Sequence, residues 1–280
     1  MLTIRSLSKT YPNGTRALNN IDLDIPTGMF GLLGPNGAGK STLMRTLATL
    51  QDADSGSAFL DELDILKQKQ ELRQILGYLP QSFGVYPRVS AEDLLDHFAR
   101  LKGISDKKER ALITEALLRQ TNLWEVRKKM VGKYSGGMKQ RFGIAQALLG
   151  NPRLIIVDEP TAGLDPAERY RFHNLLSEIG QNMIVILSTH IVEDVSDLCE
   201  NMAIIHRGEV LVKGSPAELI GSAGNNVWEA TIDKGDLESH QQLYPVISSR
   251  HFAGKIVIRA YTEQQPAEHF EAARPTLEDV

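Results

Sequence analysis

The stretch from residue 34 to residue 42 has the composition and spacing of a loop that binds phosphate. Its pattern is Gly34-x4-Gly39-Lys40-Ser41. Glycines let the backbone turn tightly and bring its N–H groups close to a polyphosphate. Lys40 is expected to reach the β- and γ-phosphates, and the Ser41 hydroxyl to hold Mg²⁺. The pattern predicts binding of a nucleoside triphosphate through Gly34, Pro35, Asn36, Gly37, Ala38, Gly39, Lys40, Ser41 and Thr42.

Two adjacent carboxylates follow an apolar run later in the chain. Residues 154–157 are Leu-Ile-Ile-Val, and Asp158 and Glu159 come directly after them. A carboxylate at the carboxyl end of a strand beside a phosphate loop suits a Mg²⁺ ligand, which would be Asp158. Glu159 is placed to polarise an attacking water. A solvated strand end fits the same residues, but the phosphate loop favours the catalytic interpretation.

A glycine pair marks a second candidate contact with phosphate. Ser135 is a good N-cap, and Gly136 and Gly137 leave their backbone N–H groups uncovered. An amphipathic helix is predicted to follow, with apolar residues at Met138, Phe142, Ala145 and Leu149, and Gly150-Asn151-Pro152 is expected to end it. A plain capped helix start would look the same locally, so the other motifs decide between the two interpretations.

The elements that would position these residues form an α/β pattern. Residues 2–33 are typical of strands with a turn at Pro12-Asn13-Gly14, and residues 29–33 form a buried strand before the loop. A helix from about Lys40 would carry Leu43, Leu47 and Leu50 on one side. Residues 154–157 and 184–187 are typical of parallel strands, joined by a crossover helix at about 167–180.

The middle and the end of the chain have different patterns. Residues 84–150 are predicted to be helical. Gly221–Asn226 is typical of a linker, and residues 227–232 and 255–261 of short strands. We therefore predict a domain at 1–221, with a helical subdomain at about 84–150, and an α+β appendage at 222–280. Two helical faces are expected in the middle part, Leu94, Leu95, Phe98 and Leu101 on one and Ile113, Ala116, Leu117 and Trp124 on the other.

Composition limits the classes of protein. The 280 residues are 42% hydrophobic and 24% charged, which is typical of soluble globular proteins. We find no apolar run near the ~20 residues of a membrane span and no signal-peptide core at the N-terminus. Cys199 is the single cysteine, so an internal disulfide framework is excluded and a reducing, cytoplasmic compartment is expected.

The charge is unevenly distributed along the chain. Of 35 acidic and 31 basic residues, 9 and 5 fall in 222–280, which leaves 26 of each in 1–221. The larger part is therefore balanced, and the excess of −4 lies in the tail. Nothing here suggests the basic field that nucleic-acid binding requires.

Taken together, the motifs resemble those of the nucleotide-binding subunits of ATP-binding cassette (ABC) transporters. The resemblance covers about residues 1–220, with Tyr134 and Met138 replacing the commonest Leu and Gln at the ends of one motif. It implies a P-loop NTPase core of ABC type with an inserted helical subdomain. The motifs are, in order, the loop 34–42, Gln81, Tyr134–Met138, Asp158-Glu159, Ala162–Asp165 and His190.

The resemblance also implies roles for single residues. Tyr11 would stack on adenine, Gln81 would reach Mg²⁺ and the attacking water, and His190 would contact the γ-phosphate. Asp165 would help to build a dimer interface. By position alone, Tyr11 is more typical of a turn tyrosine and His190 of a structural histidine, while Gln81 also fits a loop glutamine and Asp165 a helix cap. The implied catalytic residues are thus Glu159, His190, Lys40 and Gln81, and the implied magnesium ligands are Ser41, Gln81 and Asp158.

The partners follow from the same resemblance. In the family, the motif containing Ser135, Gly136 and Gly137 of one subunit closes on ATP held by the other, so a second copy or a paralogous cassette is expected. Integral membrane subunits would be the further partners, with the chain peripheral on the cytoplasmic face. No nucleic acid is expected.

The direction of transport is predicted from looser similarities. Residues 97–103 and the terminal Pro275–Val280 are similar to cassettes of exporters with separate membrane subunits, and Thr276 is placed to cap a last helix with Asp279. Residues 83–90 are expected to border a groove for the membrane partner. An importer motor is one alternative. A soluble cassette ATPase that remodels nucleic acid or ribosomes is another, although such relatives usually carry two cassettes, a coiled coil or zinc motifs.

Overall fold

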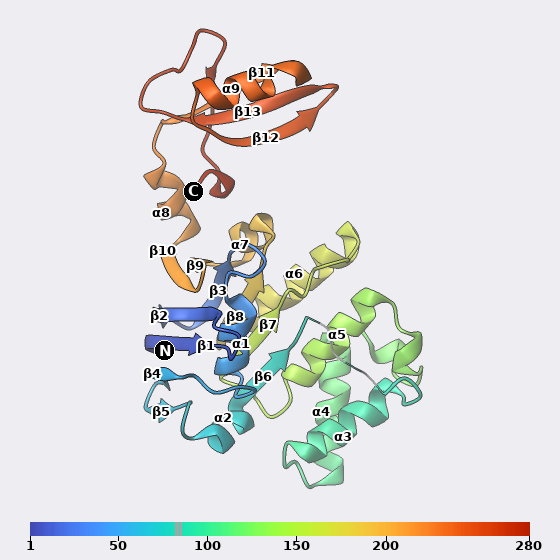
Figure 1. Ribbon diagram of the computed structural model, residues 1–280. Coiled ribbons are helices and arrows are strands. Elements are labelled where there is room, and N and C mark those ends of the chain that lie inside the picture. The colour runs from blue at the N-terminus through green and yellow to red at the C-terminus, as the bar shows by residue number, and fades with distance from the viewer. Residues whose placement is uncertain (82–83, 85) are drawn as a thin grey trace. The chain divides into compact units, whose positions relative to one another are not determined.

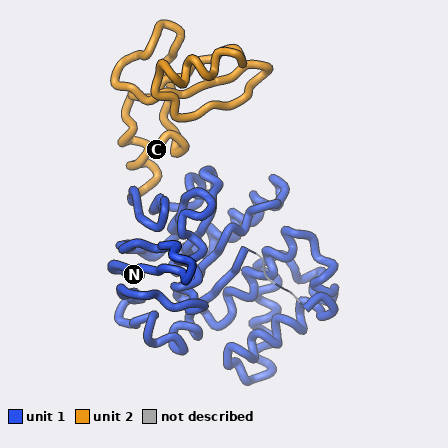
Figure 2. Tube along the Cα trace, in the orientation of Figure 1, with its two compact units in different colours: residues 1–213 blue, residues 214–280 orange. Residues whose placement is uncertain are grey.

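The computed structural model of the protein describes all residues except 82, 83 and 85 (Figure 1). Contacts divide the described part of the chain into two compact units, residues 1–213 and 214–280 (Figure 2). Helix α8 (Pro216–Ser222) belongs to the second unit, whereas the predicted boundary after residue 221 placed most of it in the first. The stretch predicted as a linker therefore begins inside this helix.

The first unit contains two sheets. An antiparallel sheet has the order β2-β1-β4-β5, and a second sheet has the order β10-β9-β3-β8-β7-β6. The strands are β1 (Leu2–Thr10), β2 (Arg16–Ile25), β3 (Gly28–Leu33), β4 (Ser55–Leu60), β5 (Leu63–Asp64), β6 (Leu76–Leu79), β7 (Leu154–Asp158), β8 (Ile184–Thr189), β9 (Asn201–His206) and β10 (Glu209–Gly214).

The strand pairing in the second sheet explains how distant residues meet. Strand β3 pairs in parallel with β8 and β9, and β7 pairs in parallel with β6 and β8. Because parallel strands present their carboxyl ends at one edge, the residues after β3, β6, β7 and β8 gather there. The predicted strands at 29–33, 154–157 and 184–187 are all confirmed.

The second sheet is covered on both faces, as its continuous apolar strands predict. On one face Phe30 and Leu32 join a core with helix α1 (Lys40–Leu47) and the antiparallel sheet. On the other face Gly31 lies against Val195 of α7 (Val192–Leu198) and against Cys199, which follows the helix. The predicted crossover helix is α6 (Pro166–Gly180).

The middle of the chain is helical, as predicted, but its apolar faces differ from those expected. Figure 1 shows helices α3 (Ala91–Leu101), α4 (Lys107–Gln120) and α5 (Gly136–Ala147) grouped together. Their shared core includes Leu94, Leu95 and Phe142. Leu101 is 69% exposed because it ends its helix. Short 3-10 turns, η1 (Trp124–Val126) and η2 (Val131–Lys133), and a helix α2 (Lys69–Ile75) complete the unit.

Three further sequence expectations are corrected. Trp124 lies in η1 and not in the preceding helix. In α4 the buried residues are Arg110, Thr114 and Leu118, whereas Ala116 is exposed. Leu50 lies beyond the end of α1 and is 61% exposed. Trp124 and Leu50 lie past the ends of the helices predicted to contain them, whereas Ala116 lies within α4 on its exposed side.

The second unit is an α+β fold, as predicted. Its sheet has the order β12-β13-β11-β14, from β11 (Val227–Ile232), β12 (Val246–Phe252), β13 (Lys255–Tyr261) and β14 (Glu271–Ala272). Its helical segments besides α8 are η3 (Lys234–Asp236), α9 (Leu237–Leu243) and η4 (Leu277–Asp279). The predicted contact between Thr276 and Asp279 forms at the start of η4, where the Thr276 backbone N–H donates to Asp279 Oδ2 at 2.7 Å and the Thr276 hydroxyl donates to the same oxygen at 2.9 Å.

The loop between β3 and α1 depends on a glycine at position 39. Gly39 has a φ of +110°, and a Cβ added there would overlap the carbonyl oxygen of Ala17 on β2. An added methyl group is therefore both conformationally strained and blocked by backbone.

We predict that Gly39→Ala lowers the free energy of unfolding by about 1–3 kcal/mol more than Gly14→Ala does. Gly14 is the matched control because its φ is +83° and an added Cβ would meet nothing within 4 Å. Urea denaturation of both variants measures the difference. Equal losses would show that backbone strain alone, and not the contact with β2, restricts position 39.

Candidate functional site

Lys40 is held inside the glycine loop. It is the first residue of α1, is 5% exposed, and its Nζ donates to the carbonyl oxygens of Gly34 at 2.6 Å and Pro35 at 3.2 Å. Burial lowers the pKa of Lys40, while the negative charges of Glu159 and Asp158 act in the opposite direction. The ammonium group therefore lies in the loop with its hydrogen bonds made by the loop itself.

Three of the predicted catalytic residues contact the fourth, Glu159. Gln81 Nε2 donates to Glu159 Oε2 at 2.9 Å, and His190 Nδ1 lies 3.2 Å from Oε1. Lys40 Nζ lies 4.0 Å from the same Oε1. The backbone of Glu159 has a φ of +47° and is anchored by a bond from its N–H to the carbonyl oxygen of Ser188 at 2.8 Å. An unusual backbone conformation thus directs this carboxylate toward the loop edge of the sheet.

Asp158 ends β7 and is almost completely buried. Among the described residues its Oδ1 has no hydrogen-bond partner, although the side chain is 4% exposed. Burial raises the pKa of Asp158, and the nearby hydroxyls of Ser188 and Ser41 act against that rise. An unpartnered carboxylate oxygen beside a hydroxyl and a phosphate loop is the oxygen-donor chemistry that Mg²⁺ prefers. The residues present therefore fit this metal ion.

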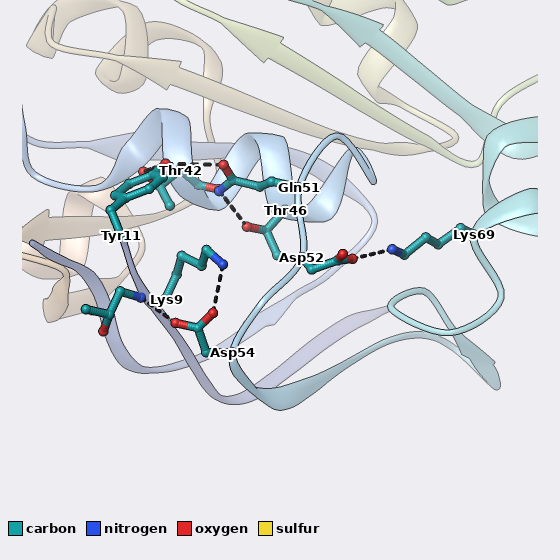
Figure 3. Close-up of polar contacts among 9 residues, drawn as sticks. Lys9, Tyr11, Thr42, Thr46, Gln51, Asp52, Asp54 and Lys69 are labelled. Atoms are coloured by element: carbon teal, nitrogen blue, oxygen red, sulfur yellow. Dashed lines mark hydrogen bonds and ion pairs between the residues drawn. The ribbon is translucent and has the colours of Figure 1, made fainter. Parts of the chain in front are cut away.

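A cavity of about 540 Å³ lies over the glycine loop. Tyr11 is one of the residues that line this cavity. The Tyr11 hydroxyl lies 3.2 Å from Thr42 Oγ1 and 3.2 Å from Gln51 Oε1 (Figure 3). Gln51 in turn donates to the carbonyl oxygen of Thr42 and to Thr46 Oγ1, so the ring is tied to α1. The cavity is lined by Tyr11, Thr15, Arg16, Ala17, residues 36–42, Gln81, Glu159 and Arg207.

Two arginines of this cavity were not predicted from the sequence. Arg16 begins β2, and Arg207 lies in the turn between β9 and β10. That turn is joined to the loop because Gly208 N–H donates to the carbonyl oxygen of Ala38 at 2.8 Å. In the sequence Arg207-Gly208 indicates only a turn, so no local signal could have placed it beside a phosphate loop.

The glycine pair lies at the start of α5, as predicted. Ser135 caps the helix by accepting from Met138 N–H at 3.2 Å. A Cβ at Gly137 would overlap the Glu168 carboxylate, which pairs with Arg141 one turn further along α5. Ser135, Gly136 and Gly137 do not occur among the residues that line the cavity over the loop. Within the described residues this motif is therefore separate from the phosphate loop of its own chain.

Asp165 has the helix-capping role that position alone allowed. It is the N-cap of α6, its Oδ1 accepts from Glu168 N–H at 2.9 Å, and Pro166 follows it at the first helical position. Its role in a dimer interface stays a prediction. The segment 83–90, expected to border a partner groove, has Phe83 and Val85 outside the described residues.

The sequence model described as ABC transporter matches residues 18–162, which is more than half of the chain. The chain belongs to the ABC transporter family. This ABC cassette is 37% identical over 250 residues to the ABC transporter ATP-binding protein YxlF of Bacillus subtilis, covering 89% of this chain and 82% of YxlF. It is 35% identical over 223 residues to the daunorubicin/doxorubicin resistance ATP-binding protein DrrA of Streptomyces peucetius, covering 79% and 67%.

Solved structures agree with the family. The dimeric, post-hydrolysis structure of the ATP-binding cassette MJ0796 bound to ADP and phosphate matches with a TM-score of 0.69 and 27% identity, covering 77% of this chain and 98% of that one. The cassette is thus an ATPase, which converts ATP and water to ADP and phosphate, and this hydrolysis is coupled to transport. The described residues contain no helix that combines the length and the apolar character of a membrane span.

Lys40→Ala is expected to weaken ATP binding by about tenfold or more, because a charge-assisted contact with phosphate is lost. Lys102→Ala is the matched control. Burial also lowers the pKa of Lys102, and its Nζ also donates to carbonyl oxygens, of Arg73 and Leu76, but it does not line the cavity over the loop. Titration with a fluorescent ATP analogue measures both. Equal affinity of the two variants for the ATP analogue would show that Lys40 does not contribute to phosphate binding.

Proposed function

We propose that this cassette is the motor subunit of an exporter, that it closes on ATP as a dimer, and that it drives separate membrane subunits from their cytoplasmic face. Support for export comes from the similarity to a drug-resistance protein and from the exporter-like residues 97–103. The single observation that carries the catalytic assignment is the contact of Gln81, His190 and Lys40 with Glu159.

In this proposal Glu159 is the group that orients the attacking water. Its carboxylate would accept a hydrogen bond from the water, since a partly buried anion that lines the phosphate cavity is a strong acceptor. Lys40 and His190 would contact the γ-phosphate, and the Gln81 amide would reach the attacking water and Mg²⁺. Tyr11 would stack on the adenine ring, because it borders the same cavity.

Mg²⁺ is the second cofactor that we propose, held by Ser41, Gln81 and Asp158. When bound, it supplies positive charge against the β- and γ-phosphate oxygens. Burial raises the pKa of Asp158, so the chain's own part would be to limit that rise. Hydroxyls of Ser188 and Ser41 and the charge of Lys40 favour the ionised form of this carboxylate.

The glycine-pair motif would complete the site of a second cassette. Gly136 and Gly137 start α5, whose N-terminal N–H groups and helix dipole favour an anion. Its separation from the cavity of its own chain supports a role in trans, where Ser135 and both glycines would contact the γ-phosphate held by a partner copy or a paralogous cassette. ATP would thereby join two cassettes, and hydrolysis would release them.

Glu159→Gln is expected to keep ATP affinity within about threefold and to lower turnover by at least about 100-fold, because the amide cannot accept a proton from water. It should also accumulate as a dimer in ATP. Steady-state phosphate release and size-exclusion chromatography measure these effects, with Glu178→Gln, an exposed residue of α6, as the control. Fast turnover by Glu159→Gln would exclude the proposed role.

A groove beside the helical subdomain suits the membrane subunit. A cavity of about 480 Å³ lies between β6, α3 and the end of α5, lined in part by Tyr78, Phe98, Leu101 and Leu149. The groove is lined by residues of β6, and β6 leads to Gln81, so a segment bound in this groove would be connected to the nucleotide site through this strand. We propose a short apolar helix of the membrane subunit as its occupant, which would explain the exposure of Leu101.

Leu101→Asp is expected to reduce the amount of co-purified membrane subunit by about tenfold and to leave the ATPase activity of the isolated cassette unchanged. Leu112→Asp on α4 is the control, since Leu112 is 70% exposed and lies outside the groove. The assay is a pull-down from detergent-solubilised membranes of the native source. Recovery of ribosomes or nucleic acid would support the soluble remodelling class, and transport assays with the recovered subunit would separate exporter from importer.

A further inference from the structure

One completely buried carboxylate connects the two loops that carry Glu159 and His190. Asp194 lies on α7 and its side chain is 0% exposed. Its Oδ2 accepts from Thr161 Oγ1 at 2.6 Å and from Thr189 Oγ1 at 3.4 Å. Thr161 lies two positions after Glu159, and Thr189 immediately precedes His190. The same oxygen therefore contacts the loop that carries Glu159 and the last residue of β8, which leads to His190.

The other oxygen of Asp194 is held by a helix. Oδ1 accepts from Arg169 Nε at 2.7 Å and lies 2.7 Å from His173 Nε2, and both partners are on α6. These two residues are four positions apart, so they lie one above the other on one side of the helix. Although burial by itself raises the pKa of Asp194, the hydrogen bonds from His173, Thr161 and Arg169 bring it below the usual value.

The two carboxylate oxygens of Asp194 contact different parts of the fold. Side chains of α6, Arg169 and His173, contact Oδ1, whereas Oδ2 accepts from two neutral hydroxyls, one in the loop after β7 and one at the end of β8. The Thr189 hydroxyl also accepts from Ile191 N–H at 3.0 Å. This hydrogen bond joins the residue before His190 to the residue after it. The Thr161 carbonyl oxygen accepts from Leu164 N–H at 3.1 Å, which extends the anchoring toward the cap of α6.

We propose that Asp194 is a positioning residue, which holds the loops of Glu159 and His190 at the separation seen in their 3.2 Å contact. This inference rests on the catalytic roles proposed above for those two residues. Asp194 does not line the nucleotide cavity, so its effect reaches the reaction only through Thr161 and Thr189. Loss of these bonds would misplace the catalytic carboxylate while the phosphate loop keeps its ligand.

The sharpest test removes one hydroxyl. Thr161→Val is expected to lower kcat by about tenfold to 100-fold, the loss that accompanies a small misplacement of a catalytic group, and to leave ATP affinity within about twofold. Thr161→Ser keeps the hydroxyl and is expected to restore kcat. Thr114→Val is the matched control because Thr114 Oγ1 is buried without a hydrogen-bond partner among the described residues, and its kcat should be unchanged.

A double-mutant cycle with Asp194→Asn identifies the route. If Thr161 acts through Asp194, the fall in kcat of the double variant is smaller than the product of the two single effects. An unchanged kcat in Thr161→Val, or independent effects in the cycle, would overturn the proposal. Glu159→Gln is run in parallel. Its fast turnover would refute the proposed function itself, whereas an inactive Glu159→Gln with an active Thr161→Val refutes the positioning role alone.

Discussion

Parallel pairing of β3, β7 and β8 is the constraint on which the site depends. In the proposed mechanism each strand leads to a residue with one chemical task, and pairing in register brings the three following segments to one edge. Lys40 follows the first strand, Glu159 the second and His190 the third, although the sequence separates them widely. The apolar runs that form these strands are therefore as necessary to the chemistry as the polar residues at their ends. A strand displaced by one residue would move its loop out of contact.

The sequence allowed the main parts of this arrangement to be predicted where the signal is local. The apolar run at 29–33, the glycine spacing and the following helix are contiguous, so their order fixes a strand, a loop and a helix. The runs at 227–232 and 255–261 likewise became β11 and β13 at the predicted bounds. Strand β12 was missed because it lies at a sheet edge and most of its residues are exposed, which leaves no regular apolar alternation.

What the sequence could not supply are contacts between distant segments. Arg207 reaches the cavity only because its turn is bonded to Ala38, and nothing in its own neighbourhood indicates this. The network of Asp194 joins residues of two loops and two helices, and each of them has an ordinary local explanation. The exposed position of Leu101 also depends on where α3 stops, and apolar spacing alone does not mark that end. The roles of the site residues themselves remain predictions.

The internal hydrogen bonds of Lys40 have a consequence for which molecules this cassette accepts. Its ammonium group already donates to the carbonyl oxygens of Gly34 and Pro35, so a ligand must exchange these bonds rather than satisfy a free donor. An anionic phosphate makes that exchange favourable, because a charged acceptor is stronger than a neutral carbonyl. A nucleoside without phosphates offers no such compensation, and stacking on Tyr11 would be its main contact. In the proposed site, discrimination between nucleotides and nucleosides would therefore follow from the loop's own bonding, independently of any recognition of the base.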